Sequence, residues 1–265
     1  MYDFTYHRPS SLADAAKTLS GASDGKLLAG GHTLIPTLKQ RLASPSDLVD
    51  LGGVKELRGI TESGGTIVIG ATTPHAMVAA DKTVKAKIAA LAHLADCIGD
   101  AQVRNLGTLG GSIANNDPAA DYPAGLVGLG ATVTTNKRKI TADDFFTGLF
   151  ETALEDNEII TAVSFPIPEK AGYSKFPNPA SRYAIVGVMV SKGAGGVRVA
   201  VTGAGPSVFR VKVMEDALAG NFSAGALDGV KVPANGLNSD IHASAEYRAH
   251  LVGVMAKRAV QAAGG

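Results

Sequence analysis

Hydrophobic residues recur at helical spacing near the start of the chain and then occur in short uninterrupted runs. Over residues 12–19 they fall at positions i, i+3, i+4 and i+7, which predicts an amphipathic helix. Ser11 opens a capping box for this helix, and Gly21 ends it. The apolar runs at 26–29 and 47–51 predict short buried strands. The start of the chain is therefore expected to alternate helix and strand.

The central part of the chain is expected to place strands around one long helix. Residues 57–61 and 66–70 flank the turn sequence ESGG and predict a hairpin. A Thr-Pro pair opens the segment 73–98, and this segment is predicted to form a single helix. Further strands are predicted at 131–135 and 158–165.

The last hundred residues carry a hairpin pattern followed by a long helical pattern. The sequence PIP at 166–168 predicts a domain boundary near residue 167. Residues 184–190 and 197–202 flank the turn sequence GAGG and predict a β-hairpin. A helix is predicted over 243–263, with an apolar stripe that contains Tyr247, Leu251 and Met255. The chain is thus expected to end in an antiparallel sheet backed by helices.

Two glycine pairs, far apart in the sequence, are the strongest chemical signal. The first, in GGHT at 30–33, lies between the strand 26–29 and a stretch of helical character at 33–42. The second, in TLGGS at 108–112, lies in a polar segment at 99–121 without periodicity, which predicts a functional loop. A glycine pair lets the backbone approach an anion and turn its N–H groups toward it. Together the two pairs predict a grip on the diphosphate of a dinucleotide.

Composition narrows the possibilities. The 265 residues suffice for one large domain or for two to three small ones, and 45% of them are hydrophobic, which is typical of a packed globular protein. The formal net charge of +1 gives no nucleic-acid or membrane-surface footprint. The N-terminus has no signal-peptide pattern, and no apolar run is long enough to span a membrane, so a cytoplasmic protein is expected. Cys97 is the only cysteine, so the chain alone forms no internal disulfide and no four-cysteine metal site.

Other motifs carry little weight. The sequence GAGP at 203–206 lacks the last glycine of a dinucleotide fingerprint, and its proline removes an N–H, so a turn is predicted. The six histidines show no metal-ligand spacing. His32, Asp117 and Asp121 lie in or beside the glycine motifs, and each has two interpretations: ligand contact, or local turn and helix-cap chemistry.

Read together, residues 28–36 (LAGGHTLIP) and 103–121 (VRNLGTLGGSIANNDPAAD) resemble the FAD-binding medium subunits of the molybdenum hydroxylases. That family includes the carbon monoxide dehydrogenase medium subunit and the flavin domain of xanthine dehydrogenase. The similarity continues in order along essentially the whole chain, at residues 4–19, 69–73, 160–166 and 181–187. The pair Asn115-Asn116 departs from the xanthine dehydrogenase pattern.

The resemblance implies an α+β fold. Its first part is a two-part α/β FAD-binding domain of the PCMH or vanillyl-alcohol-oxidase-like type over 1–166, with subdomains at about 1–55 and 56–166. A small C-terminal domain with an antiparallel sheet and helices follows over 167–265. FAD is expected in the cleft between the first two parts and the third.

The resemblance also implies which residues bind FAD. The segments around the two glycine pairs would wrap the pyrophosphate, and Asp121 would contact the hydroxyl-bearing chain of the cofactor. Ile98 and Ile160 would line the site, and Lys175 or Tyr183 would approach the flavin. No catalytic acid, base or metal ligand is implied. The expected cofactor-binding residues are Ala29, Gly30, Gly31, His32, Thr33, Ile98, Thr108, Gly110, Gly111, Ser112, Asp117, Asp121, Ile160, Lys175 and Tyr183.

The implied function is electron transfer within a complex. A molybdopterin-containing large subunit would oxidise the substrate, and a small subunit with [2Fe–2S] clusters would pass electrons to the flavin of this chain. The complex would be a dimer of heterotrimers, and its acceptor would be NAD, a quinone or dioxygen. Two alternatives remain open: a free-standing FAD-dependent oxidase or dehydrogenase, and a non-catalytic nucleotide-binding module.

Overall fold

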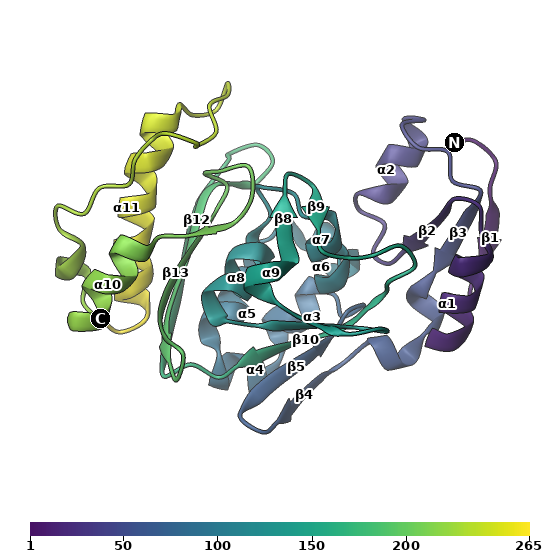
Figure 1. Cartoon of the computed structure of the whole chain (residues 1–265), viewed down its shortest axis with the longest axis horizontal. Coiled ribbons are helices and arrows are strands. Elements are labelled where there is room, and N and C mark those ends of the chain that lie inside the picture. Colours follow the sequence, from purple (N-terminus) through teal and green to yellow (C-terminus); the bar gives the residue numbers. More distant parts are fainter.

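The computed structural model describes residues 1–265 and has an α+β architecture, as predicted. Figure 1 shows three successive units along the long axis of the molecule. The first contains a parallel sheet in the order β1-β3-β2, with Ser11 accepting a hydrogen bond from the N–H of Asp14 at the start of its first helix. Its elements are β1 (Thr5–His7), α1 (Leu12–Gly21), β2 (Gly25–Leu28), α2 (Leu34–Lys39) and β3 (Asp47–Asp50).

The second unit is built on an antiparallel sheet in the order β4-β5-β10-β6-β7. The predicted ESGG hairpin joins the first two of these strands. Alternate residues of β5 and β10, such as Ile67, Ile69 and Phe165, are fully buried and belong to the largest core of the protein. The five strands are β4 (Ile60–Ser63), β5 (Thr66–Gly70), β6 (Thr132–Thr135), β7 (Lys139–Thr141) and β10 (Ile160–Pro166).

Short helices pack against this sheet, and here two predictions were wrong. The helix expected over 73–98 is three helices, because Asp81 ends one and caps the next, and Ile88 adopts a non-helical conformation. The loop expected over 99–121 contains two capped helices. The helices and the small hairpin of this unit are α3 (His75–Ala80), α4 (Lys82–Lys87), α5 (Ala89–Asp96), α6 (Ala101–Leu106), α7 (Leu109–Asn115), α8 (Asp121–Leu129), α9 (Ala142–Phe145), β8 (Phe146–Gly148) and β9 (Glu151–Thr152).

The third unit is an antiparallel sheet in the order β11-β12-β13-β14. Helix α11 covers one face of this sheet, and α8 lies against the other. The predicted hairpin forms between its two long central strands. The elements are β11 (Lys170–Pro177), β12 (Ala184–Gly193), β13 (Gly196–Thr202), β14 (Phe209–Arg210), α10 (Lys212–Gly220) and α11 (Ala245–Ala262).

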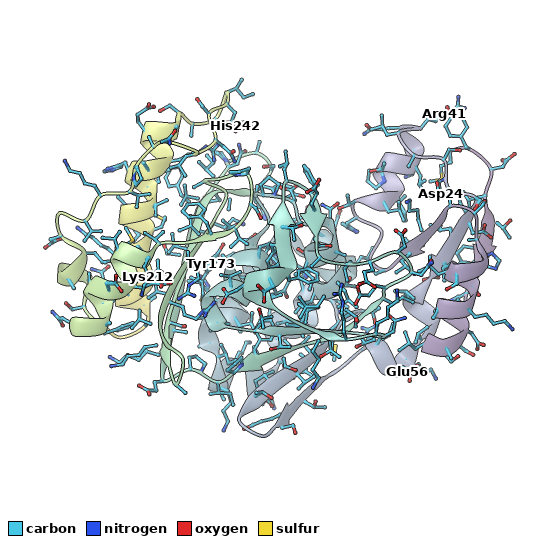
Figure 2. All side chains as sticks on the ribbon, in the orientation of Figure 1. Asp24, Arg41, Glu56, Tyr173, Lys212 and His242 are labelled. Carbon is cyan, nitrogen blue, oxygen red and sulfur yellow. The ribbon has the colours of Figure 1, made fainter.

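Burial on both faces explains the unbroken apolar run of β12. Val188 belongs to the core shared with α11, whereas Met189 belongs to the core shared with the helices of the second unit. Tyr173 on β11 belongs to the same core as Met189 and lies between the sheet and the central helices (Figure 2). The third unit is therefore packed firmly against the second.

The C-terminal helix forms as predicted, but its buried stripe differs from the predicted one. Leu251 and Met255 are buried, whereas Tyr247 is 44% exposed and places its ring at right angles to that of Phe176. The aromatic pair lies at the edge of the core, which explains the partial exposure. None of the helices is long and apolar enough to cross a lipid bilayer.

Candidate cofactor site

A cavity of about 610 Å³ lies where the three units meet. Its wall includes the turn after β2, the helices α6 and α7, the start of α8 and the segment Ser181–Tyr183 that precedes β12. Cofactor sites of proteins usually measure about 300–1,000 Å³. The volume of the cavity therefore lies within the usual range for cofactor sites.

The two glycine pairs meet at this cavity, as predicted. A Cβ atom on Gly30 would lie 2.2 Å from the carbonyl oxygen of Leu106 and 2.8 Å from the Cα of Gly107. Only a residue without a side chain allows the turn after β2 to approach the turn between α6 and α7 so closely. A Cβ on Gly111 would lie 3.9 Å from that of Ala29, which brings the second glycine pair against the same turn.

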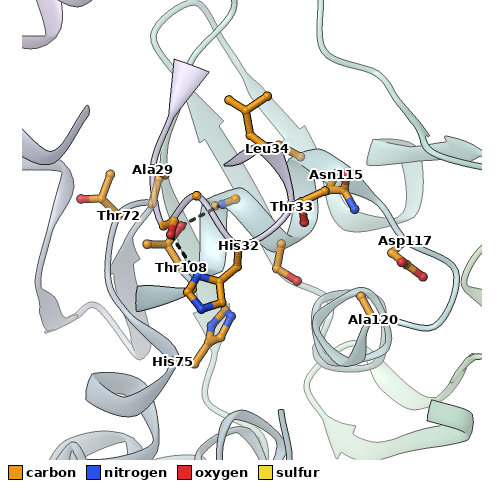
Figure 3. Close-up of a pocket in the computed structure, with 18 of the residues that line it drawn as sticks. Ala29, His32, Thr33, Leu34, Thr72, His75, Thr108, Asn115, Asp117 and Ala120 are labelled. Carbon is orange, nitrogen blue, oxygen red and sulfur yellow. Dashed lines mark hydrogen bonds between the residues drawn. The ribbon is translucent and has the colours of Figure 1, made fainter. Parts of the chain in front are cut away.

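The first glycine motif presents unused backbone donors. The N–H groups of Gly31, His32 and Thr33 donate to no oxygen of the protein, and Gly31 has a φ of +72°. His32 instead places its Nδ1 3.1 Å from the carbonyl oxygen of Gly30 (Figure 3). Three successive free N–H groups at the start of a helix form a site suited to phosphate oxygens. This turn therefore fits the diphosphate of FAD.

The second glycine motif is built differently. The N–H of Gly110 donates to the carbonyl oxygen of Ala71 at 2.8 Å, and that of Gly111 donates to the hydroxyl of Thr108 at 3.2 Å. The N–H of Ser112 donates to the carbonyl of Thr108 at 3.0 Å. The expectation that both glycine pairs turn free N–H groups to phosphate is therefore wrong. The second pair lies in the first turn of helix α7, and its N–H groups donate to oxygens of the protein.

The two glycines of this motif also face opposite ways. Gly110 is buried, and a Cβ on it would lie 2.7 Å from the Cβ of Ala71 and 2.8 Å from its carbonyl oxygen. Gly111 is exposed and lines the cavity together with Ser112. Gly110 thus lets α7 pack against the end of β5, and Gly111 leaves the cavity side of this turn without a side chain.

Asp121 belongs to a buried polar network at the junction of the second and third units. It lines the cavity, accepts a hydrogen bond from the hydroxyl of Tyr173 at 2.5 Å and pairs with the ammonium of Lys175 at 2.9 Å. Burial raises the pKa of Asp121, and the Lys175 ammonium and the Tyr173 hydroxyl oppose that shift. The network fixes the orientation of the Asp121 carboxylate, because each of its two oxygens has a partner on β11.

Lys175 does not reach the cavity wall, in contrast to expectation. Its ammonium lies behind Asp121 and also donates to the carbonyl oxygen of Cys97 at 3.1 Å. Cys97 itself is half-buried at the C-terminal end of α5 rather than inside a helix. Lys175 therefore acts on the cavity through the charge of Asp121.

The remaining expected residues all line the cavity. Ile98 and Ile160 supply apolar surface, and Tyr183 is 48% exposed at the mouth. Asp117 accepts a hydrogen bond from the N–H of Ala119 at 2.8 Å, and burial raises its pKa. Every sequence-predicted cofactor-binding residue except Lys175 therefore lines the same cavity. Asp117 also stabilises the local turn, so both of its interpretations agree with the structure.

The departure at Asn115-Asn116 has a structural consequence. Asn115 lines the cavity, whereas Asn116 ends α7 in the left-handed conformation with a φ of +44°. The amide of Asn116 donates to the carbonyl oxygens of Gly148 and Glu151, at 2.9 and 2.7 Å. The pair thus ties the cavity wall to the hairpin β8–β9.

Sequence reasoning missed His75. This residue is 4% exposed, lines the cavity next to His32 (Figure 3) and places its ring 5.3 Å from that of Tyr122. A Cβ on Gly107 would lie 2.7 Å from its Nε2. Burial, helped by the charges of His32 and Arg104, lowers the pKa of His75 to about 4, so the ring is neutral. Its place directly after the Thr-Pro pair indicated only a helix start.

Arg182 was missed as well. It lines the cavity, has a φ of +63° and donates from Nη1 to the carbonyl oxygen of Gly99 at 3.2 Å. The hydrogen bond joins the third unit to the second across the mouth of the cavity. Nη1 of Arg104 donates to the same carbonyl oxygen, also at 3.2 Å.

Comparisons with known proteins agree with this site. Residues 2–168 match the FAD binding domain in molybdopterin dehydrogenase, and residues 171–263 match the C-terminal domain of the CO dehydrogenase flavoprotein. The chain is 35% identical to the carbon monoxide dehydrogenase medium chain of Hydrogenophaga pseudoflava, over 98% of this chain and 96% of that protein. It is 36% identical, with the same coverage, to the nicotine 6-hydroxylase medium subunit of Paenarthrobacter nicotinovorans.

A solved structure gives the same result. Quinoline 2-oxidoreductase from Pseudomonas putida 86 superposes with a TM-score of 0.89 and 31% identity, over 99% of this chain and 98% of the matched chain. Sequence and structure thus match over nearly the full length of the chain. The protein belongs to the family of FAD-binding medium subunits of the molybdenum hydroxylases, which are flavoprotein subunits of oxidoreductase complexes.

Proposed function

We propose that this subunit takes electrons from the [2Fe–2S] clusters of a partner subunit and passes them through its FAD to an external acceptor. The main support is the meeting of the two glycine motifs at a cavity of about 610 Å³, with three free N–H groups for the diphosphate. FAD supplies the redox chemistry, and the chain supplies binding and orientation. In this proposal residues 1–166 hold most of the cofactor, and residues 167–265 close its site.

The composition supports a division of labour among subunits. With Cys97 as its single cysteine, the chain by itself offers no set of thiolates for an iron–sulfur cluster. The clusters would therefore lie in a small subunit, and a molybdopterin-containing large subunit would choose and oxidise the substrate. Relatives named for carbon monoxide and for nicotine have similar medium subunits, which agrees with a substrate choice made elsewhere in the complex. We further propose that two such heterotrimers associate.

Isolation of the tagged chain from its own cells, without oxygen, tests this proposal. Molybdenum, iron and FAD should be found together with the chain, and a substrate of the large subunit should reduce the flavin. The chain produced alone and loaded with FAD should not be reduced by that substrate. Reduction of the isolated chain by a small organic donor would favour a free-standing flavin enzyme. A chain that cannot be loaded with FAD would favour a nucleotide-binding module.

A further inference from the structure

The segment 118–121 leads into helix α8 and forms part of the wall of the cofactor cavity. Ala120 and Asp121 line the cavity, and Ala120 lies beside it in Figure 3, close to Asp117. The residues 118–120 belong to no helix or strand, so the ladder of a regular element does not fix their carbonyl groups. Backbone carbonyl groups inside a protein need hydrogen-bond donors. The position of this part of the wall therefore depends on which groups supply the donors.

The third unit supplies donors along the whole segment. The carbonyl oxygen of Pro118 accepts a hydrogen bond from the N–H of Gly203, at 2.7 Å. That of Ala119 accepts one from the N–H of Ala184, at 3.2 Å. The carboxylate of Asp121 is held by two side chains of β11. This part of the wall of the cofactor cavity is thus fastened to a sheet that belongs to a different unit.

Thr202 of β13 supplies the donor for Ala120. Its side chain is fully buried, and its hydroxyl lies 2.6 Å from the carbonyl oxygen of Ala120 and 3.0 Å from that of Pro118. A hydroxyl has one proton to donate. Because Pro118 already accepts the N–H of Gly203, the hydroxyl proton is available for the shorter contact to Ala120. Thr202 does not line the cavity itself, so it acts on the cofactor site through the position of Ala120.

Ser191 of β12 makes a matching hydrogen bond at the other end of α8. Its side chain is buried, and its hydroxyl donates to the carbonyl oxygen of Gly128, also at 2.6 Å. This bond crosses the same junction between the second and third units. Neither Ser191 nor Gly128 lines the cofactor cavity. Two buried hydroxyls therefore hold the two ends of one helix, and only the end held by Thr202 borders the cavity.

We infer that the third unit shapes the cofactor wall through the segment 118–121, and that Thr202 is a positioning residue for FAD. This inference rests on the proposed function, because FAD has to occupy this cavity. With the hydroxyl in place, the wall around Ala120 is ordered before FAD arrives. Without it, the carbonyl group of Ala120 loses a buried partner, and part of the binding free energy is needed to order the wall.

Titration of the full FAD-free chain with FAD, followed by flavin fluorescence, tests the inference. Thr202→Val puts a methyl group where the hydroxyl faced the carbonyl of Ala120 and should weaken FAD binding about tenfold. Thr202→Ser keeps the hydroxyl and should bind FAD within about twofold of the unaltered chain. Ser191→Ala is the matched control, because it removes one buried hydroxyl from the same junction. It should retain the FAD affinity of the unaltered chain.

Urea unfolding of the FAD-free variants separates positioning of the wall from general stability. Thr202→Val and Ser191→Ala should lower the unfolding midpoint by similar amounts, although only the first weakens FAD binding. Tyr173→Phe is a second variant of the same wall, because it removes the hydroxyl that Asp121 accepts at 2.5 Å, and it should also weaken FAD binding about tenfold.

Three results separate the inference from the proposed function. The inference fails if Thr202→Val binds FAD as tightly as Ser191→Ala or, where Thr202→Val does not fold, if Tyr173→Phe does so. Equal losses in Thr202→Val and Thr202→Ser would also overturn it, because the hydroxyl would then not be the cause. Failure of the unaltered chain to bind FAD would instead count against the proposed function.

Discussion

The two glycine motifs look alike in the sequence and do different work in the structure. In the first, Gly31 adopts a φ of +72° and is followed by two residues whose N–H groups are also free. In the second, Gly110 and Gly111 form the first turn of α7, and their N–H groups already have partners. A glycine pair beside a helix start is thus no proof of a phosphate cradle. A glycine pair can bind phosphate through its backbone only if its N–H groups do not already donate to oxygens of the protein.

The largest effect is expected for Gly30→Ala. The new methyl group would lie 2.2 Å from the carbonyl oxygen of Leu106, so the two glycine motifs would be forced apart. Overpacking of this kind costs roughly 1–3 kcal/mol, and a clash with backbone belongs at the upper end. FAD content should fall to near zero, and the melting temperature should drop. Gly195→Ala, where a methyl group meets open space, is the control, and equal losses in both variants would contradict the explanation.

Lowering the pH should destabilise the contact between α3 and the turn after α6 through protonation of His75. Its pKa is about 4 in the folded chain and near 6.5 when unfolded, so the unfolded chain binds the extra proton first. The contribution of neutral His75 to the free energy of unfolding is therefore fully present above pH 6.5. It is lost as the pH drops from 6.5 to 4, by about 3 kcal/mol. Urea unfolding across this range measures the loss. His75→Gln should flatten the curve, and an unchanged slope in that variant would show that another group is responsible.

A pair of alanine variants separates the two roles inside the second motif. Gly110→Ala places a methyl group 2.8 Å from the carbonyl oxygen of Ala71 and should cost about 2 kcal/mol of folding stability. Gly111→Ala brings its methyl group 2.9 Å from the hydroxyl of Thr108 and 3.9 Å from the Cβ of Ala29, and meets no backbone atom within 4 Å. It should weaken FAD binding and cost at most the value of the Thr108 cap, about 1 kcal/mol, because only a movable hydroxyl has to shift. If Gly111→Ala were instead the less stable variant, the assignment of the two faces would be reversed.

The smallest effect is expected for Thr108→Ala. The hydroxyl caps α7 by accepting the N–H of Gly111, and loss of such a cap costs about 1 kcal/mol. The same change leaves the N–H of Gly111 without that acceptor, as the N–H groups of the first motif are. Thermal unfolding should show the loss, and Thr108→Ser should restore stability. A larger loss in Thr108→Ser than in Thr108→Ala would rule out the capping role.

Local patterns predicted most of the strands and the positions of both glycine motifs. The short capped helices were missed because α6 and α7 have no long apolar stripe. Their starts depend on the side chains of Asp100 and Thr108, which a reading for periodicity does not weigh. Glycine in the first turn of α7 also lowers the helix propensity of that segment.

Contacts between distant residues could not be predicted from local patterns. The placement of Lys175 behind Asp121 depends on how β11 packs against α5 and α8, and no local signal reports it. The approach of His75 to Gly107 depends in the same way on the packing of α3 against α6. The family resemblance implied that Lys175 or Tyr183 approaches the flavin, but only the packing shows that the ammonium of Lys175 is engaged by Asp121 and the carbonyl oxygen of Cys97.

Residue-resolved amide hydrogen exchange, followed by NMR with and without FAD, tests the central claim most directly. The amides of Gly31, His32 and Thr33 should exchange rapidly in the FAD-free chain and become strongly protected when FAD binds. Those of Gly110 and Gly111 should be protected in both states, because their partners lie within the protein. Slow exchange of the first group without FAD, or a large gain of protection confined to the second, would contradict the account.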